Sequence, residues 1–267
     1  MGYRAFFAGV SLAVLLMPAF SAQAATPNEL YVNRVYLDLL ARPADSTALS
    51  TYVPQLDAAT LSRFNFAASI TSSDEFLSDE VSDFYQHLLQ RAADPTGAST
   101  NLNLLKTPGG TFEQVQSILA GSAEYFTLHG SANDAFISAL YSDFLNRPVD
   151  NIGLQAGETF LQQGGTRSDL AASILSSSEY RSDLVSGYYL ELLHRPADTN
   201  GLNTFVGALN SGNKDQFVID SLIASSEYFN NAVPEPSMAL LASSLMILML
   251  RSHSRRNASA RRALLGA

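Results

Sequence analysis

The chain has 267 residues, of which 16 are Lys or Arg and 25 are Asp or Glu, so its formal net charge is −9. An acidic chain repels the phosphate backbone, and nucleic acid is therefore excluded as a predicted partner. The sequence contains no cysteine, which excludes disulfide scaffolds, thiol nucleophiles and thiolate metal sites.

The N-terminal segment, residues 1–24, has the layout of a secretory signal peptide. Arg4 precedes an apolar stretch over residues 5–17, and Ala22-Gln23-Ala24 supplies the small residues of a cleavage site. We expect signal peptidase to cut after Ala24 and the rest of the chain to be exported. An uncut signal anchor is the alternative, but the apolar core is short for a membrane span.

Residues 29–230 contain the same unit four times. Each copy has an aromatic residue, an apolar pair, Arg, and Asp three positions after the Arg, at residues 36–45, 85–94, 141–150 and 189–198. A second signature, in which Ser and Glu precede Phe or Tyr, closes each copy. The recurring charged residues are Arg42, Asp45 and Glu75; Arg91, Asp94 and Glu124; Arg147, Asp150 and Glu179; Arg195, Asp198 and Glu227.

The apolar residues within each copy indicate helices. In residues 32–40 and 137–145 they recur at three- and four-residue spacing, as on one face of an amphipathic helix. The Arg-Pro step should end this helix, and the following Asp should cap the next one. A third helix should follow polar or Gly turns, where Thr111 with Gln114 and Asn213 with Gln216 have capping-box character.

We therefore predict an all-α array of four repeats with about three helices each. Residues 25–130 hold repeats one and two, and residues 131–232 hold repeats three and four. Whether these form one compact body or two pairs divided near residues 129–133 stays open.

The C-terminal segment, residues 233–267, has the order of a sorting tail. Pro234, Glu235 and Pro236 come before an apolar run, and Arg251, Arg255 and Arg256 follow it. Prolines interrupt a helix, the apolar run can enter a bilayer, and arginines favour the cytoplasmic side. Residues 237–250 as a helix span roughly 21 Å, against a hydrocarbon core of about 30 Å. We expect transient membrane insertion rather than a permanent anchor.

Two resemblances add to these observations. The tail resembles the PEP-CTERM sorting signal of Gram-negative bacteria, which implies recognition by an exosortase and cleavage near Pro234–Pro236.

The repeats resemble the bacterial domain of unknown function 4214, whose unit carries a Tyr-x-x-Leu-Leu-x-Arg-x-x-Asp-x-x-Gly-Leu core and ends in Ser-x-Glu-Phe or Ser-x-Glu-Tyr. That family implies a secreted or surface-layer-type protein and no established activity. Two positions depart from the pattern: Ala48 replaces its glycine and Ala92 its proline.

The recurring charges favour a structural role. The arginine of each copy can interact with a helix carbonyl end and form a forked ion pair with the following Asp or the later Glu. Catalytic residues seldom recur once per repeat, whereas a turn that every repeat makes needs the same residues each time. Calcium requires about six to eight oxygen ligands, and each Arg-to-Asp turn offers one carboxylate. We expect no cofactor, with a calcium-stabilised surface-layer module as the alternative.

Catalysis finds little support in the sequence. The histidines occupy unrelated positions of different repeats, and no metal-binding His spacing accompanies them. Paired acids such as Asp79 with Glu80 suggest glycoside hydrolysis, but we find no acid set apart by an apolar environment that would raise its pKa. We therefore expect an exported, non-enzymatic protein of the cell surface or biofilm matrix that binds exopolysaccharide or other surface proteins. A polysaccharide-active hydrolase is the remaining alternative.

Overall fold

A computed structural model describes residues 25–233, and within this range the chain forms fourteen α-helices and no strands. The predicted all-α class is confirmed for these residues. The predicted signal peptide and the predicted sorting tail beyond Val233 lie outside the described residues.

Each repeat uses the same three kinds of helix. The first kind carries the recurring aromatic residue and apolar pair: α1 (Pro27–Leu40), α4 (Asp74–Leu89), α8 (Asn133–Leu145) and α11 (Ser178–Leu193). The second kind follows the recurring Asp: α2 (Ser46–Asp57), α5 (Pro95–Leu105), α9 (Asn151–Gln162) and α12 (Thr199–Asn210). The third kind is α3 (Arg63–Thr71), α6 (Phe112–Ala120), α10 (Arg167–Leu175) and α13 (Asp215–Ala224). Two further short helices are α7 (Ala123–Leu128) and α14 (Ser226–Ala232).

The first helices end two residues before the recurring arginine, earlier than the sequence predicts. Their C-caps are left-handed, with φ between 48° and 56°, at Ala41, Gln90, Asn146 and His194. A left-handed residue stops a helix because it turns the chain away from the axis. The recurring arginine comes next and therefore lies in the turn, where its side chain is free to reach other elements.

The Ser-Glu signature, which we did not assign to a helix of its own, begins a helix in every copy. Ser73, Ser122, Ser177 and Ser225 are the N-caps, each accepting a hydrogen bond from a backbone amide. In repeats one and three this helix continues without a break as the first helix of the next repeat, α4 or α11. In repeats two and four it is the separate short helix α7 or α14. The three predicted helices are present in every repeat, and α7 and α14 are added to them in repeats two and four.

The spacing between repeats explains the break after α7. Nine positions separate Phe76 from Tyr85, and nine separate Tyr180 from Tyr189, but sixteen separate Tyr125 from Tyr141. The seven extra residues include residues 129–132, where Gly130 has φ of 88° and Ser131 has φ of 60°. The chain reverses its direction here. We call residues 129–132 the hinge, residues 25–128 the first half and residues 133–233 the second half.

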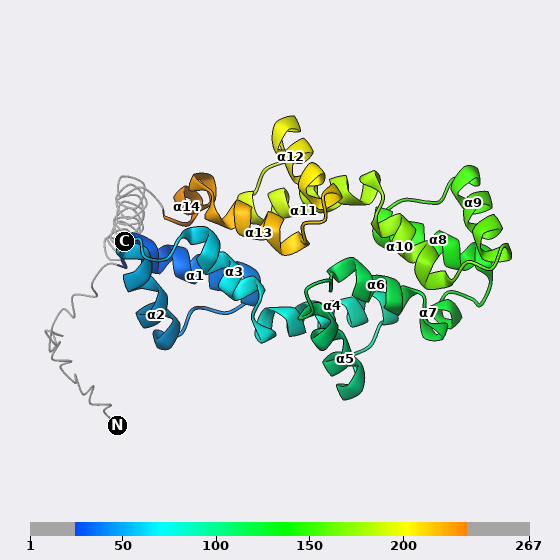
Figure 1. Cartoon of the computed structure of the whole chain (residues 1–267), viewed down its shortest axis with the longest axis horizontal. Helices are drawn as coiled ribbons and strands as arrows, with labels where there is room; N and C mark the ends of the chain where they lie inside the picture. Colours follow the sequence, from blue (N-terminus) through cyan, green and yellow to red (C-terminus); the bar gives the residue numbers. More distant parts are fainter. Residues whose placement is uncertain (1–24, 234–267) are drawn as a thin grey trace, which may run out of the picture.

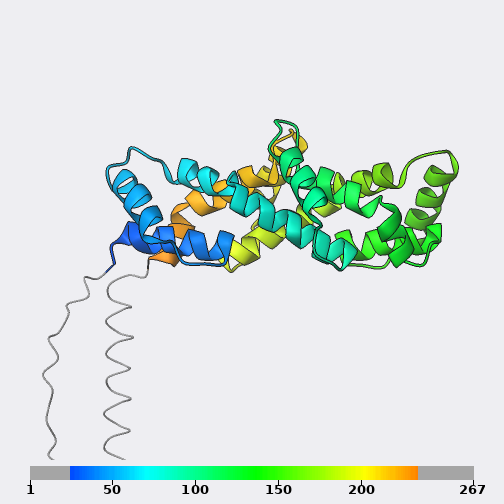
Figure 2. The same ribbon diagram turned by 90° about the horizontal axis from the view of Figure 1, so that it is seen from below.

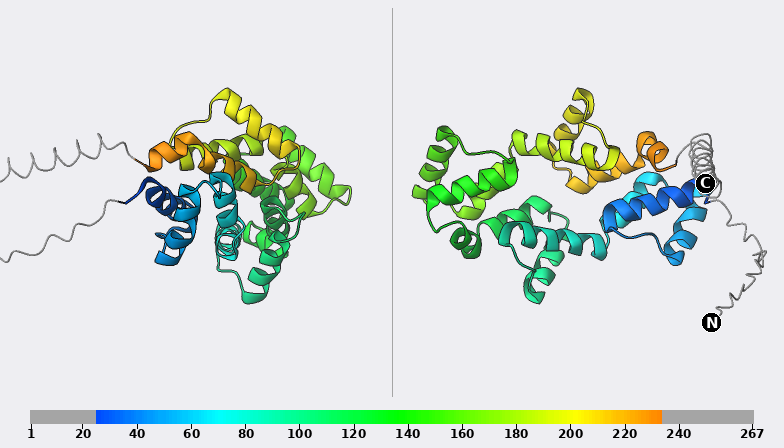
Figure 3. Two further views of the ribbon diagram at one scale, coloured as in Figure 1. Left: turned by 60° about the vertical axis from the view of Figure 1, so that its left-hand side comes forward. Right: turned by 180° about the vertical axis from the view of Figure 1, so that it is seen from behind.

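The two halves lie side by side as two rows. Helices α1 to α7 run along one row and α8 to α14 return along the other, so that α1 and α14 meet at the same end (Figures 1 and 2). Between the rows, α3 packs against α13 and α6 packs against α10. Figure 3 shows α1 beside α14 from two further directions. The four repeats therefore form one closed body.

The body has an approximate internal twofold symmetry. Each helix of the first half has a counterpart in the second: α1 matches α8, α3 matches α10, α6 matches α13, and α7 matches α14. The packing of α3 on α13 accordingly repeats as the packing of α10 on α6. Buried apolar residues of both halves belong to one continuous core, with Tyr31, Phe66, Phe136 and Ile223 fully buried or nearly so. Residues 25–233 thus hold a core of their own and should fold without the flanking segments.

The two ends of the body are closed by the same contacts. At the hinge end, the Tyr125 hydroxyl donates to Asp143 Oδ2 at 2.7 Å. At the other end, where no chain connects α14 to α1 within the body, the Tyr228 hydroxyl donates to Asp38 Oδ2 at 2.8 Å. Tyr125 and Tyr228 stand at the same position of their repeats, as do Asp143 and Asp38. The noncovalent junction between α14 and α1 therefore has the same hydrogen bond as the covalent junction between α7 and α8.

The packing of aromatic side chains is also equivalent at the two ends of the body. Tyr228 meets Tyr31 edge to face at 6.0 Å between ring centroids, and Tyr125 meets Phe136 in the same way at 5.9 Å. The next residue of each short helix is Phe, and an arginine lies over its ring. These cation–π pairs are Arg63 over Phe229 and Arg167 over Phe126.

Candidate functional site

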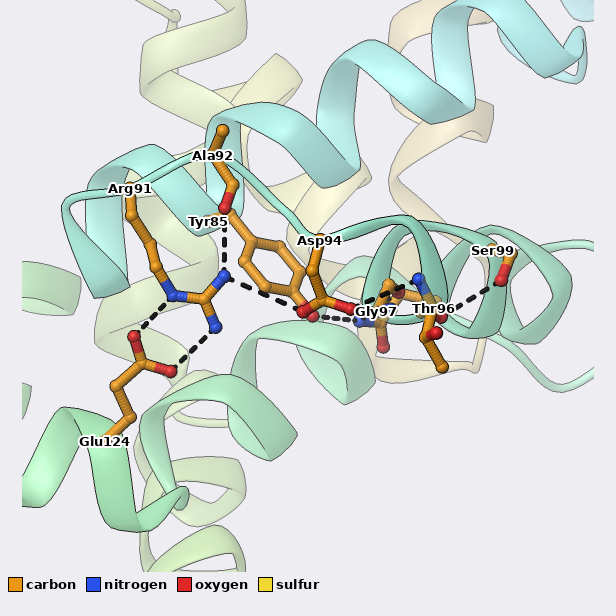
Figure 4. A network of polar contacts seen from close by, with 9 residues as sticks. Tyr85, Arg91, Ala92, Asp94, Thr96, Gly97, Ser99 and Glu124 are labelled. Atoms are coloured by element: carbon orange, nitrogen blue, oxygen red, sulfur yellow. Dashed lines mark hydrogen bonds and ion pairs between the residues drawn. The ribbon is translucent and has the colours of Figure 1, made fainter.

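The recurring arginine, glutamate, aspartate and tyrosine come together in four equivalent clusters. The arginine guanidinium forms a forked ion pair with the glutamate that begins the next Ser-Glu helix, and the following aspartate lies beside it. Figure 4 shows the second of these clusters, formed by Tyr85, Arg91, Asp94 and Glu124. The arginine Nη2 donates to the glutamate Oε2 at 2.7 Å for Arg42–Glu75, 2.7 Å for Arg91–Glu124, 2.9 Å for Arg147–Glu179 and 2.7 Å for Arg195–Glu227.

Of the two partners left open by the sequence, the arginine takes the glutamate. The aspartate is 3.5 to 3.8 Å from the guanidinium, too far for a strong hydrogen bond. It caps the second helix instead. Its Oδ1 accepts from the amide three residues on, at 2.8 Å for Asp45, 2.9 Å for Asp94, 2.7 Å for Asp150 and 2.9 Å for Asp198.

Two further contacts hold each arginine in place. Its Nη1 donates to the carbonyl of the next residue, which is Pro43, Ala92, Pro148 or Pro196. The guanidinium also lies over the recurring tyrosine ring, between 5.0 and 5.2 Å from the centroid. Ala92 supplies the same carbonyl as the prolines, so its departure from the repeat pattern leaves this contact intact.

The glycine of the repeat pattern makes room for the same tyrosine. An added Cβ at Gly97, Gly153 or Gly201 would lie within 2.4 Å of the hydroxyl of Tyr85, Tyr141 or Tyr189. In these three repeats the tyrosine hydroxyl of the first helix therefore occupies the space at the start of the second helix that a Cβ would need. Repeat one has Ala48 at this position, and both Ala48 and Tyr36 are buried.

The chemistry of these clusters is that of an exposed, well-oriented ion pair. The hydrogen bonds from arginine lower the pKa of the carboxyls of Glu75, Glu124, Glu179 and Glu227. A glutamate held ionised in this way cannot act as a general acid at neutral pH. Each cluster ties the turn after a first helix to the Ser-Glu helix at the end of the same repeat.

A second candidate site is a cavity of about 430 Å³ between α1, α4, α11 and α13. Five of the residues that line it are acidic: Asp38, Asp79, Glu80, Asp83 and Glu191. Burial raises the pKa of Glu80 to about 7, and the nearby charges of Asp83 and Glu191 add to this shift. Burial also raises the pKa of Glu191 and of Asp79.

The sequence interpretation of these acids was wrong. It treated Asp79 and Glu80 as neighbouring surface acids, none of them set apart by an apolar environment. The structure points Glu80 toward the second half, where Tyr188, Leu192 and Ile219 also line the cavity. The missing information is that α4 and α11, which lie far apart in the sequence, line the same cavity.

Two more acids are buried between the halves. Asp220 of α13 is 4% exposed and accepts a hydrogen bond from Thr71 Oγ1 of α3 at 2.9 Å, and burial raises its pKa to about 7. Asp215 is 2% exposed, and burial together with the nearby Glu113 raises its pKa well above the ordinary range. Its Oδ1 has no hydrogen-bond partner among the described residues. A protonated carboxyl is the form that such a position favours.

The described residues contain no group of three or more His, Asp or Glu side chains that could hold a metal ion. Among residues 25–233 no helix is both long and apolar enough to cross a membrane. The predicted membrane segment, residues 237–250, and the sorting-motif residues Pro234, Glu235, Pro236, Arg251, Arg255 and Arg256 lie beyond the described part of the chain.

Comparison with known proteins identifies the repeat. A search of curated proteins and a search of solved structures each found no match. The family model described as Domain of unknown function (DUF4214) matches residues 13–80, 115–184 and 180–232, which cover more than half of the chain. Arg91 and Asp94 fall outside these matches, yet their cluster has the same geometry as the other three. The chain therefore belongs to the DUF4214 family.

Proposed function

We propose that this protein is an exported, non-enzymatic helical-repeat module of the cell surface or extracellular matrix of a Gram-negative bacterium. The observation that carries the proposal is the fourfold recurrence of the Arg–Glu–Asp–Tyr cluster. In every copy these residues hold a turn against the start of a helix. The recurring ion pair and helix cap therefore have a structural role. A rigid acidic body with extended helical faces is suited to binding polymers or other surface proteins.

The flanking segments supply the proposed route. Signal peptidase removes residues 1–24, and the tail beyond Val233 enters the membrane for a time, with its arginines on the cytoplasmic side. An exosortase then cuts near Pro234–Pro236 and places the body outside the cell, where an exopolysaccharide is the proposed partner. The body carries twenty-four acidic against ten basic residues. A neutral or cationic matrix polymer is therefore favoured over a polyanionic one.

The test compares native cells that make the intact chain with cells that make the triple variant Pro234→Ala, Glu235→Ala, Pro236→Ala. We expect mass spectrometry of the intact protein's surface fraction to find an N-terminus near Ala25 and a C-terminus between Val233 and Pro236. The variant should stay in the membrane fraction with its tail. Recovery of either protein in the cytoplasm, or of a mature surface form that keeps Arg262, would contradict the route.

A calcium-stabilised surface-layer module is the first alternative. It would use the carboxylates of the Arg-to-Asp turns as ligands. Asp45, Asp94, Asp150 and Asp198 each accept a backbone amide with one oxygen, which leaves a single free carboxylate oxygen per turn. This is far fewer than calcium requires, so the alternative has less support than the non-metal module.

A polysaccharide-active hydrolase is the second alternative, and Glu80 is the observation that favours it. Glycoside hydrolysis combines a carboxylic acid of raised pKa with a second, ionised carboxylate. Glu80 supplies the acid of raised pKa, and Asp38 and Asp83 line the same cavity as candidates for the second carboxylate. The variant Glu80→Gln should abolish any release of reducing ends from matrix polysaccharide, and the exposed Asp183→Asn should not. Equal activity in both variants, or none in the unaltered protein, would remove this alternative.

A further inference from the structure

We propose that two copies of this chain can exchange halves, so that the first half of one copy packs against the second half of another. The partner is thus a second copy of the chain, and the surface is the one that joins α3 to α13 and α6 to α10. This inference rests on the fold and extends the proposed matrix function, since exchanged chains can assemble into larger structures.

The halves are joined covalently at one end only. Residues 129–132 connect them at the hinge, whereas α14 and α1 meet through side chains alone. Tyr228 with Asp38 and Tyr125 with Asp143 make the same hydrogen bond at the two ends. A half that swings away about the hinge therefore leaves behind a surface that the matching half of another copy fits without any new contact.

The hinge differs from the other two junctions between repeats. In α4 and α11, where the seven extra residues are absent, the Ser-Glu helix continues directly into the next first helix. The bent junction requires a left-handed conformation at Gly130 and at Ser131, and the latter is unfavourable for a residue with a side chain. Opening relieves this local cost, and short connections between packed halves are known to promote exchange.

Buried polar groups specify which halves pair. Asp220 is matched to Thr71 across the interface. At the corresponding positions of the other interface stand Ser117 on α6 and Leu175 on α10, both buried. Two second halves packed together would place each Asp220 against a leucine, leaving a buried carboxyl without a partner, which is costly. Exchange is therefore favoured between a first half and a second half.

Closure within one chain competes with exchange. A short connection gives the attached half an effective concentration in the millimolar range, so one chain closes on itself when it is dilute. Exchange should become visible when copies are concentrated to a similar level, as they would be in a surface layer or matrix. The product is a closed dimer or, if each chain pairs with two neighbours, an open chain.

The test uses residues 25–233 and a backbone-cyclised control in which Val233 is joined directly to Thr26. This joint places Tyr36 sixteen positions after Tyr228, the same spacing as between Tyr125 and Tyr141 across the hinge. Cyclisation leaves the sequence of residues 26–233 unchanged and prevents exchange. Both proteins are incubated at about 1 mM in mild denaturant and returned to buffer. Their molar masses are then measured by size-exclusion chromatography with light scattering.

We expect species of doubled mass, with unchanged helix content, in the linear protein and only monomer in the cyclic one. A linear protein that stays monomeric overturns the proposal. Dimers in both proteins also overturn it, because association would then not require exchange. The readout is independent of export and of any matrix ligand, so the proposed function can fail without affecting this result.

A second variant tests the hinge itself. Deleting residues 129–135 removes the seven extra residues and leaves the same spacing as in α4 and α11. Without them the halves cannot fold back on each other, so the variant should be a helical dimer or a larger assembly at every concentration. A matched control replaces the same seven residues with Gly and Ser and should remain able to close as a monomer. A helical monomer from the deletion variant would overturn the proposal.

Discussion

The hydrogen bond between Tyr228 and Asp38 allows a direct test of how the body closes. The substitution Tyr228→Phe removes one hydroxyl and changes no packing volume. Asp38 keeps its ion pair with Arg34, whose Nε donates to Oδ2 at 2.7 Å, so the carboxylate is not left without a partner. A hydrogen bond to a charged group contributes about 2 kcal/mol, and we expect this loss in the free energy of unfolding.

Tyr125→Phe is the internal comparison, because it removes the equivalent bond at the hinge end. Its cost should also be about 2 kcal/mol, since the geometry is the same. Tyr52→Phe serves as a control: its hydroxyl accepts from Ser69 at 3.4 Å in an exposed place, and its loss should change little. Urea unfolding followed by circular dichroism measures all three variants.

Local opening should separate the two equivalent sites. Helix α14 is held to α1 by side chains alone, whereas α7 is tethered to α8 by the hinge. Tyr228→Phe should therefore speed hydrogen exchange in α14 roughly thirtyfold, the factor that corresponds to about 2 kcal/mol. Tyr125→Phe should speed exchange in α7 by less. An unchanged free energy in Tyr228→Phe beside a clear loss in Tyr125→Phe would show that the two ends are not equivalent.

Three further predictions concern the caps, the buried acids and metal. Asp150→Ala should lower the free energy of unfolding by about 1 kcal/mol, as for other helix caps, and a neutral result would refute the capping role. Burial raises the pKa of Asp220 to about 7, above its unfolded value near 4, so this group reduces stability progressively as pH rises from about 4 to about 7. Asp220→Asn should therefore gain stability relative to the unaltered protein over that window in urea titrations, and parallel pH profiles would contradict this. Millimolar calcium should leave the melting temperature nearly unchanged, whereas a rise of many degrees that a chelator reverses would promote the calcium alternative.

Local features of the fold could be predicted from the sequence. The caps at Asp45, Asp94, Asp150 and Asp198 follow from the side chain and its immediate neighbours, and all four are the N-caps of the second helices. Thr111 also caps its helix as predicted. The prediction failed at Asn213, because the third helix of repeat four begins after Lys214, which has no side-chain cap.

Contacts between distant elements could not be predicted in this way. The left-handed C-caps could not be predicted from the sequence, because four different residue types, Ala, Gln, Asn and His, occupy these positions. The choice of Glu over Asp as the partner of arginine depends on where the end of the repeat returns, 32 or 33 residues later. Thr71 and Asp220 are 149 residues apart, and only the pairing of the rows brings them together. The seven extra residues were visible in the spacing, but their effect on chain direction was not.

The heterologous packing of α3 against α13 and α6 against α10 has a consequence for chain length. Each pair of repeats has one helix equivalent to α3 and one equivalent to α6. A helix of the first type packs against a helix of the second type. A chain enlarged by a single repeat would leave one of these surfaces facing water, whereas a chain enlarged by two repeats could close again as a wider ring. Stable relatives of this protein should therefore lengthen in steps of two repeats, each step marked by one junction of sixteen positions in place of nine.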